Sequence, residues 1–258
     1  MLNHVELFGF NFIAEQNLTT VVDDILQKEC YEEPGKYPFL ITPNVDYVVK
    51  LSKNVNKGLK NIFINSAYIL PDGEPIILAS KFSNSKLPKR LTGSDLFPLL
   101  WSKSKTDFKI LALTSSENIS SLLQKDNSNA ICYTLPFFDL SEKNVVEKIT
   151  NECANILLKE HIKIVIIGVS FPKQDVLALN IYNRLKELNA EKIPLFCMLG
   201  ASFEFYLKLK KRAPVFMQKS GFEWLYRFSR EPIRLFKRYF IDDVAFLPIL
   251  LKEIFRNK

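Results

Sequence analysis

The sequence lacks the motifs by which several common enzyme classes are identified. It contains no GxGxxG, GxxxxGKS/T, GxSxG or HExxH, and it has no Asp-x-Asp of the kind used by metal-dependent sugar-nucleotide enzymes. Only two histidines are present, His4 and His161. This disfavours a histidine-based triad and a multi-histidine metal site. We therefore expect chemistry that rests on other side chains and needs no metal.

Cysteines and long apolar runs are also scarce. The longest apolar runs, such as Ile164–Val169, are about six or seven residues, far below the ~18 that a membrane-spanning helix needs. Met1–Phe12 has neither the positive charge nor the long apolar run of a signal peptide. The four cysteines are far apart and form no CxxC pair, and three of them lie in or beside apolar stretches. This predicts reduced core thiols in a cytosolic protein rather than a disulfide framework or a metal site. The cysteines are Cys30, Cys132, Cys153 and Cys197.

Charge is unevenly distributed along the 258 residues. Tyr206–Lys258 holds 13 Lys or Arg against 5 Asp or Glu, a balance of +8, whereas the whole chain carries +7. Eleven of the 32 aromatic residues lie in the same segment. This predicts a catalytic domain over residues 1–205 and a basic, aromatic appendage over residues 206–258 that docks on something anionic. The two candidates are a phospholipid surface and nucleic acid.

Within the body, short β-branched or aromatic runs alternate with helical patterns. This predicts an α/β fold with a mainly parallel sheet covered by helices on both faces. The predicted strands are Val5–Phe10, Pro38–Thr42, Ile62–Ile64, Lys109–Leu113, Ala130–Leu135, Lys163–Val169 and Pro194–Met198. The predicted helices are Leu18–Lys28, Val45–Leu51, Ser94–Lys103, Val145–Lys159 and Gln174–Leu188. Ligands of such sheets bind in the loops after the strands, here Thr42–Asn44, Thr114–Ser116 and Ser170–Gln174.

The appendage has the pattern of two helices. One is expected from about Val215, and Pro232 is expected to open the other because proline is favoured at the first helical position. In the second helix Ile233, Phe236 and Phe240 share one face. Two interpretations remain open: this face packs on the body, or it lies in a membrane interface.

Several polar residues stand where a buried α/β sheet has little structural use for them. Asp72, in Pro71-Asp72-Gly73 after an apolar run, can act as a general base or can simply mark a tight turn. Asn44 and Thr42 are suited to a helix cap and its neighbour. Pro172–Asp175 has the pattern of a strand-to-helix turn. None of these motifs identifies a function alone.

Taken together and in order, however, the motifs resemble those of the WecG/TagA/CpsF glycosyltransferases, which form glycosyltransferase family 26. The resemblance extends from about Val5 to Phe240, and Lys211–Arg238 is its most specific part. The motifs are Thr42-Pro43-Asn44, Pro71-Asp72-Gly73, Lys86–Asp95, Pro172–Asp175, Arg212-Ala213-Pro214 and Gly221–Arg227.

This resemblance implies a Rossmann-like core with a helical C-terminal appendage. It also implies an inverting transfer of a sugar from a UDP-sugar to an acceptor sugar on a polyprenyl pyrophosphate, in bacterial cell-surface polysaccharide assembly. The sugar would be an N-acetylhexosamine, its uronic acid or a hexose, and the UDP-sugar would be a substrate rather than a cofactor. The enzyme would be peripheral on the inner face of the cytoplasmic membrane and would not bind nucleic acid. The resemblance leaves both a monomer and a homo-oligomer open.

The resemblance further implies roles for individual residues. Asp72 matches the base that deprotonates the acceptor hydroxyl. Thr42, Asn44, Arg90 and Gln174 match residues that line the same pocket, and an arginine such as Arg90 can contact phosphate bidentately. Basic side chains of the appendage would close over the pyrophosphate or contact lipid headgroups. They are Arg227, Arg230, Arg234 and Arg238.

The sequence departs from the family pattern on the donor side. Leu113-Thr114-Ser115-Ser116 stands where the family usually has a glycine-rich turn. The hydroxyls of Thr114 and Ser115 can bind phosphate, but the closest backbone approach is lost. Glu204 stands where the family usually has an aspartate, and Asp175 stands where it usually has a glutamate. These changes leave an alternative open, an inactive membrane-recruited scaffold of the same pathway. A nucleic-acid binder, suggested only by the basic tail, ranks last.

Overall fold

The structure is a computed structural model that describes residues 1–82, 86–214, 216–217 and 223–256, without the side chains of residues 227, 234 and 256. Three predictions therefore lie outside the described residues: the start of a helix near Val215, and the contacts of the Arg227 and Arg234 side chains. Gly221 and Phe222 of the family motif lie outside them as well.

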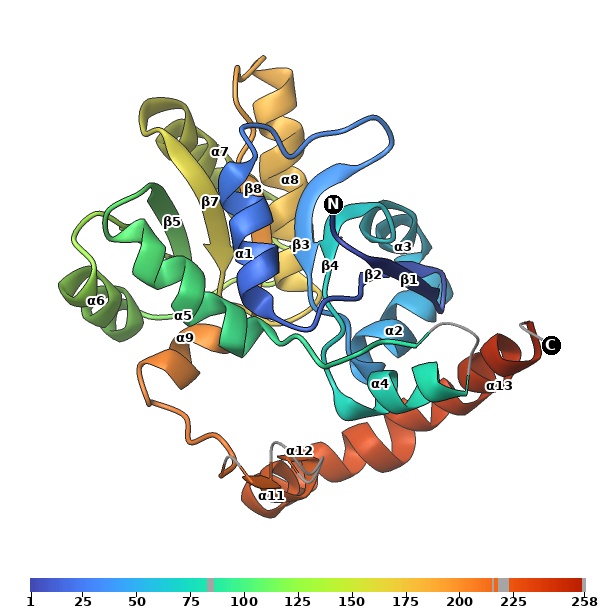
Figure 1. Cartoon of the computed structure of the whole chain (residues 1–258). Coiled ribbons are helices and arrows are strands. Elements are labelled where there is room, and N and C mark those ends of the chain that lie inside the picture. Colours follow the sequence, from blue (N-terminus) through green and yellow to red (C-terminus); the bar gives the residue numbers. More distant parts are fainter. Residues whose placement is uncertain (83–85, 215, 218–222, 257–258) are drawn as a thin grey trace.

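A six-stranded parallel sheet forms the centre of the fold (Figure 1). Its strand order is β4-β3-β8-β7-β5-β6. The strands are β3 (Tyr37–Ile41), β4 (Ser66–Ile69), β5 (Lys109–Thr114), β6 (Ile131–Thr134), β7 (Ile162–Ile167) and β8 (Leu195–Met198). Ile164–Ile167 of β7 are fully buried, as a strand covered on both faces requires. The predicted α/β fold is confirmed.

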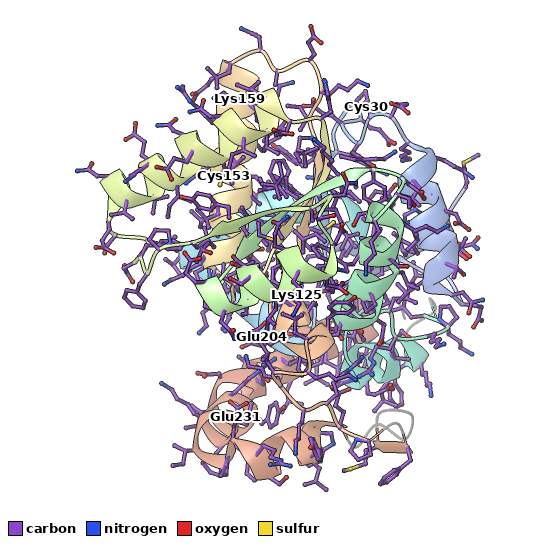
Figure 2. The ribbon with its side chains drawn as sticks, turned by 90° about the vertical axis from the view of Figure 1, so that its left-hand side faces the viewer. Cys30, Lys125, Cys153, Lys159, Glu204 and Glu231 are labelled. Carbon is purple, nitrogen blue, oxygen red and sulfur yellow. The ribbon has the colours of Figure 1, made fainter. Side chains whose placement is uncertain are left out.

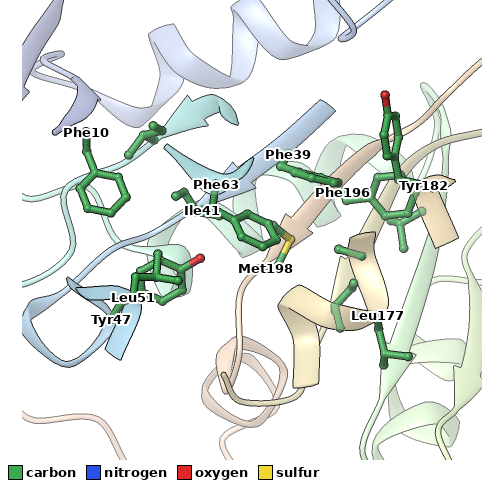
Figure 3. Packing of buried hydrophobic residues seen from close by; sticks show 14 of the residues in the cluster. Phe10, Phe39, Ile41, Tyr47, Leu51, Phe63, Leu177, Tyr182, Phe196 and Met198 are labelled. Atoms are coloured by element: carbon green, nitrogen blue, oxygen red, sulfur yellow. The ribbon is translucent and has the colours of Figure 1, made fainter. Parts of the chain in front are cut away.

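Helices cover both faces of the sheet, and side chains alternate between two cores because successive strand residues point to opposite faces. Val165 and Ile167 pack with α2 (Val45–Ser52), α3 (Lys57–Phe63), α4 (Glu74–Lys81), α7 (Lys143–Lys159) and α8 (Lys173–Glu187). In this core Phe39 lies 5.2 Å from Phe63 and 5.9 Å from Phe196, measured between ring centroids (Figure 3). Ile164 and Ile166 pack with α1 (Leu18–Gln27), α5 (Gly93–Ser104), α6 (Glu117–Asp126) and α9 (Ser202–Tyr206).

Two strand predictions were wrong. Val5–Phe10 is not one strand but part of a hairpin, β1 (His4–Leu7) and β2 (Phe10–Ile13), which turns at Phe8 and Gly9. Both turn residues have positive φ, 56° and 78°, as in the two-residue turns that match strand twist. Ile62–Ile64 ends helix α3 instead, and the strand begins at Ser66. A short apolar run is compatible with either structure, so its sequence does not decide between them.

The C-terminal segment packs on α2 and returns to the N-terminal hairpin (Figure 1). It consists of α11 (Glu223–Arg230), α12 (Pro232–Lys237), the helical turns η2 (Arg238–Asp242) and η3 (Asp243–Ala245), and α13 (Phe246–Arg256). Pro232 opens α12 as predicted. Phe246 is buried against Phe8, with ring centroids 5.1 Å apart, and the Phe8 amide donates a 3.2 Å hydrogen bond to Glu253. The division of the chain after Phe205 stays a prediction.

The apolar face of α12 does not pack on the body. Ile233, Phe236 and Phe240 are 90%, 53% and 56% exposed, whereas Leu235 is buried. The interpretation in which this face covers the body is therefore wrong. All four cysteines are free thiols; Cys153 and Cys197 are buried, as predicted, whereas Cys132 is half-buried and Cys30 is exposed, so the prediction of core thiols was wrong for these two. Within the described part of the chain, no helix has the length and apolar character needed to cross a bilayer.

Candidate active site

Two cavities lie at the carboxyl ends of the strands, where ligands of parallel sheets bind. We call the first the arginine cavity, because Arg90, Arg212 and Arg238 line it, and the second the lysine cavity, because Lys173 and Lys210 line it. The arginine cavity, of about 450 Å³, lies between the ends of β3 and β4, the start of α5 and the C-terminal segment. Its lining also includes Asn44, Asp72, Glu74, Pro75, Thr92, Ser94, Glu223, Trp224, Tyr239, Phe240, Asp243 and Phe246.

Asp72 and Asn44 come together in the arginine cavity. Asp72 follows β4, and its backbone N–H donates a 3.1 Å hydrogen bond to the carbonyl of Pro43, in the loop after β3. Gly73 adopts φ +116°, a conformation that favours glycine, and a Cβ at this position would lie 3.6 Å from that of Asn44. The two loops are thus packed directly on each other, with the Asp72 carboxylate half-buried at the cavity.

Asn44 also caps helix α2. Its Oδ1 accepts a 3.0 Å hydrogen bond from the backbone N–H of Tyr47, so the capping role is confirmed. The same oxygen lies 3.5 Å from Nη2 of Arg238. A capping residue therefore takes part in the wall of the cavity.

Two ion pairs join the body to the residues that follow α9. Arg90 Nη1 donates to Glu223 Oε2 at 2.9 Å, and Arg212 Nη1 donates to Asp95 Oδ1 at 2.6 Å. Burial lowers the pKa of Arg90, but the Glu223 and Asp72 carboxylates outweigh burial and raise it. Burial raises the pKa of Asp95, but hydrogen bonds from Arg212 and Thr92 lower it below its usual value. The family motif around Arg90 thus holds the C-terminal segment in place.

Of the four appendage arginines predicted to contact pyrophosphate or lipid, Arg238 has a described side chain that lines the cavity. Its Nε lies 3.7 Å from Asp243 Oδ2 and its Nη2 lies 3.8 Å from Asp46 Oδ2, beyond ordinary hydrogen-bond distance. Among the described residues its Nε has no hydrogen-bond partner. Burial raises the pKa of Asp243 to about 6, although Arg238 lowers it. Arg230, by contrast, is exposed and packs over the ring of Tyr226 at 5.6 Å.

Other predicted residues are engaged inside the protein. Gln174 is buried, and its Oε1 accepts a 3.2 Å hydrogen bond from the backbone N–H of Gly200. Thr42 is half-buried, with its methyl group 3.5 Å from where a Cβ on Gly93 would lie. Thr114 is fully buried, and its hydroxyl lies 2.6 Å from that of Ser120. The geometry gives these three residues structural roles, and their part in substrate binding stays a prediction.

The lysine cavity, of about 400 Å³, lies over the ends of β5, β6, β7 and β8. β5 and β7 are neighbours in the sheet. After β5 the chain proceeds through α6 to the edge strand β6, whereas after β7 it proceeds through α8 to β8, in the opposite direction across the sheet. Adjacent strands whose connections diverge form a topological switch point, where ligands bind. The lining of the lysine cavity is formed by Ser115, Leu135, Pro136, Phe137, Phe138, Gly168, Val169, Ser170, Lys173, Gly200, Ala201, Glu204 and Lys210.

Gly168, which follows β7 and lines this cavity, packs closely against Phe203. A Cβ here would lie 2.3 Å from the ring of Phe203, so a side chain is excluded. At Thr114–Ser116, after β5, the chain lacks the glycine-rich turn that is usual in the family. The sequence signal of Gly168 was a glycine directly after the apolar run Ile164–Ile167, in a chain with only eight glycines.

Cationic, aromatic and acidic side chains surround the lysine cavity. Lys173 Nζ donates to the carbonyl of Phe138 and lies 5.2 Å from the ring centroid of Phe137, which is 98% exposed. Lys210 Nζ pairs with Glu204 Oε1 at 3.2 Å. The other oxygen, Oε2, is buried without a hydrogen-bond partner in the part of the chain that the structure describes. Figure 2 shows Glu204 where the body faces the C-terminal helices.

A buried pair lies between α2 and α8. The hydroxyl of Tyr47 donates a 2.5 Å hydrogen bond to Oδ1 of Asp175, which is fully buried. Burial raises the pKa of Asp175 to about 7, although the hydrogen bond from Tyr47 lowers it. This pair links the helix capped by Asn44 to the helix that carries Gln174.

Comparisons with known proteins agree with the motifs. The family model described as "Glycosyl transferase WecG/TagA/CpsF family" matches residues 5–258. Relatives named N-acetylglucosaminyldiphosphoundecaprenol N-acetyl-beta-D-mannosaminyltransferase include proteins of Bacillus spizizenii and Bacillus subtilis. The first is 22% identical over 227 residues, 86% of this chain and 81% of the relative. The second is 21% identical over 264 residues, 95% of this chain and 90% of the relative. A Staphylococcus aureus (strain MW2) protein of the same name is 23% identical over 226 residues, 85% and 80% of the two chains.

Proposed function

Because the chain belongs to the WecG/TagA/CpsF glycosyl transferase family, we propose that it transfers a sugar from a UDP-sugar to an acceptor sugar linked to a polyprenyl pyrophosphate. The family makes the chain a glycosyltransferase. The transferred sugar is an N-acetylhexosamine, its uronic acid or a hexose, and the reaction inverts the anomeric carbon. The product is an intermediate of a bacterial cell-surface polysaccharide. The names of the relatives support a lipid-linked, amino-sugar acceptor.

The observation that carries this proposal is the carboxylate of Asp72 in a cavity lined by three arginines. In the proposed step the carboxylate of Asp72 takes the proton of the acceptor hydroxyl. The oxygen of that hydroxyl attacks the anomeric carbon of the donor sugar. The bond from that carbon to the UDP oxygen breaks, and its electron pair leaves with UDP. One carboxylate is sufficient for such an inverting displacement. The arginines are suited to the acceptor pyrophosphate. Within the described part of the chain, Nε of Arg238 has no hydrogen-bond partner.

The lysine cavity is suited to the nucleotide. Lys173 and Lys210 supply positive charge for phosphates, and the N-terminus of α8, where Lys173 lies, adds its dipole. Phe137 offers an exposed ring on which a base can stack. Glu204 lines the same cavity, and a carboxylate there is suited to accept hydrogen bonds from ribose hydroxyls. The donor sugar would then extend past Gln174 and Thr42 towards Asp72, across the neighbouring ends of β8 and β3.

The acceptor's polyprenyl chain requires the enzyme to work at a membrane. The exposed side chains of Ile233, Phe236 and Phe240, with the +8 charge of residues 206–258, support binding to an anionic surface. Each nearby Lys or Arg is attracted to such a surface by about 1 kcal/mol. We propose that the enzyme acts on the inner face of the cytoplasmic membrane.

The test is transfer from a panel of UDP-sugars to a polyprenyl-pyrophosphoryl amino sugar in anionic vesicles. Wild type should turn over one donor, and Asp72→Asn should lose at least 100-fold in rate with an unchanged unfolding temperature, since a general base contributes about 10²–10⁴. Glu74→Gln, which changes another carboxylate of the same cavity, is the control and should lose far less. Vesicle binding without turnover of any donor would instead support the inactive scaffold.

A further inference from the structure

We propose that helix α4 forms a second membrane-contact surface, beside the arginine cavity and separate from the C-terminal segment. Its apolar stripe consists of Pro75, Leu78 and Phe82, and we call it the α4 stripe. The occupant is an anionic phospholipid bilayer. The inference rests on the proposed function, because a lipid-linked acceptor is what requires the cavity to open onto a membrane.

The α4 stripe is one face of a short helix whose other face is in the core. Ile76, Ile77 and Ala79 are buried, whereas Leu78 and Phe82 are 54% and 64% exposed. Residues at positions i, i+3 and i+7 share a helical face, so Pro75 begins the stripe that Leu78 and Phe82 continue. A single exposed leucine is ordinary. This stripe is informative because Pro75 also lines the arginine cavity, so the exposed apolar surface starts at the site itself.

A second apolar surface starts from the same cavity. Phe240 lines the arginine cavity and is partly exposed. Its ring packs on that of the exposed Phe236, with 5.0 Å between the ring centroids. Helix α4 and the C-terminal segment are held by one core, because Ile76, Ile77 and Phe246 belong to the same buried cluster. Figure 1 shows both along the same side of the molecule. The cavity therefore has exposed apolar side chains on its α4 side and on its C-terminal side.

The charge around the α4 stripe selects the occupant. Lys81, Lys86 and Lys89 are exposed and follow or border the stripe. Apolar side chains next to lysines are the composition of surfaces that lie in the headgroup region of anionic bilayers. A second copy of this chain would present the same positive surface and be repelled. Nucleic acid would match the lysines but not the exposed leucine and phenylalanine.

Contact at two places would orient the enzyme, which one patch alone does not do. Asp72 and Gly73 directly precede α4, so a helix held at the bilayer surface sets the height of the Asp72 carboxylate above the headgroups. A lipid-linked pyrophosphate lies at that level while its polyprenyl chain stays in the bilayer. The α4 stripe would therefore favour acceptors presented by a membrane over the same sugar in solution.

The test is partition of the full chain into vesicles of equimolar phosphatidylglycerol and phosphatidylcholine. Leu78→Asp/Phe82→Asp should bind about tenfold more weakly than wild type, because two exposed apolar side chains lose their contact and two like charges meet the anionic lipid. The matched control is Leu158→Asp/Leu188→Asp, at positions 48% and 39% exposed. These lie at the ends of α7 and α8, away from the C-terminal helices, as the label of Lys159 shows (Figure 2). The control should stay within twofold of wild type.

A second measurement reports contact directly. Phe82→Trp should gain fluorescence quenching by vesicles whose acyl chains carry bromine, whereas Leu158→Trp should add none beyond wild type. Transfer to a water-soluble acceptor analogue should keep its wild-type rate in Leu78→Asp/Phe82→Asp.

Several outcomes would overturn the inference. One is equal vesicle partition of Leu78→Asp/Phe82→Asp and its control, and another is no added quenching in Phe82→Trp. A third is that Leu78→Asp/Phe82→Asp loses self-association in sedimentation velocity while its vesicle partition is unchanged. The last would assign the stripe to a second copy. Partition and quenching need no sugar transfer, so they can show membrane contact of the α4 stripe even if the proposed reaction is not observed. Sugar transfer can likewise be observed even if the stripe makes no membrane contact.

Discussion

Arg90 in the body and Glu223 in α11 form an ion pair, with Nη1 and Oε2 2.9 Å apart across 133 positions of sequence. Only 15% and 14% of the two side chains are exposed. An arginine expected to bind phosphate is therefore already held by a carboxylate of the C-terminal segment. The arginine cavity is complete only when that segment is docked, and an incoming phosphate meets Arg90 together with Glu223.

Removing this carboxylate should loosen the C-terminal segment. In Glu223→Gln the charge of Arg90 stays half-buried without its ion-pair partner, which we expect to destabilise docking by about 1–3 kcal/mol. Limited trypsin digestion should then cut residues 206–222 about tenfold faster, while the body stays intact. Glu231→Gln, an exposed position in the same segment, is the control. Equal cleavage rates in both variants would show that the pair does not hold the segment.

Arg238 should act on the acceptor rather than on the fold. Arg238→Gln removes a cavity guanidinium whose Nε has no hydrogen-bond partner among the residues that the structure describes, so we expect the KM for a lipid-pyrophosphate acceptor to rise about 10–100-fold. Arg238→Lys should recover only part of this loss, because the lysine keeps the charge but not the planar fork. Arg230→Gln, in contrast, should change vesicle affinity and leave the KM for a water-soluble acceptor unchanged. A normal KM in Arg238→Gln would remove Arg238 from the proposed site.

The lysine cavity should bind the nucleotide. Phe137→Ala should weaken UDP binding about 5- to 100-fold, the range of a lost base–aromatic stacking contact, in isothermal titration calorimetry. Lys173→Gln should weaken UDP more than uridine, because the lysine is expected to contact phosphate. Lys125→Gln, at the end of α6 (Figure 2), is the control. Wild-type affinity in both cavity variants would place the nucleotide elsewhere.

Asp175 should make stability depend on pH. Burial raises the pKa of Asp175 to about 7, above the value near 4 of an unfolded chain, so the folded state binds the proton more tightly. Its contribution to stability is fully present below about pH 4 and is lost as pH rises to about 7. Asp175→Asn does not titrate there. Between pH 4.5 and pH 8 the free energy of unfolding of the variant should rise, relative to that of wild type, by up to a few kcal/mol, at about 1.4 kcal/mol per pKa unit.

Urea unfolding at those two pH values measures this gain. Taking the difference between variant and wild type cancels the titration of other groups, such as Asp243, whose pKa burial raises to about 6. A difference that is the same at pH 4.5 and pH 8 would mean that Asp175 titrates alike in the folded and unfolded chain.

Much of the fold could be predicted from local pattern. The apolar run Ile164–Ile167 and its neighbours identified the parallel sheet, because a strand covered on both faces must be continuously apolar. Local pattern failed at Ile62–Ile64, where the same short apolar run serves a helix. It also failed at Val5–Phe10, where the turn at Phe8 and Gly9 is set by backbone conformation rather than by polarity.

By itself the sequence determined the fold class and the family, and it placed Asn44 after a predicted strand and Asp72 after an apolar run. These follow from short-range spacing, which any chain displays without folding. Only the tertiary structure decided that Arg238 rather than Arg230 lines the cavity, that Glu223 pairs with Arg90, and that Phe203 packs against Gly168. Such choices depend on contacts between residues far apart in the chain. Their energies arise from burial and charge at short distance, which sequence spacing does not encode.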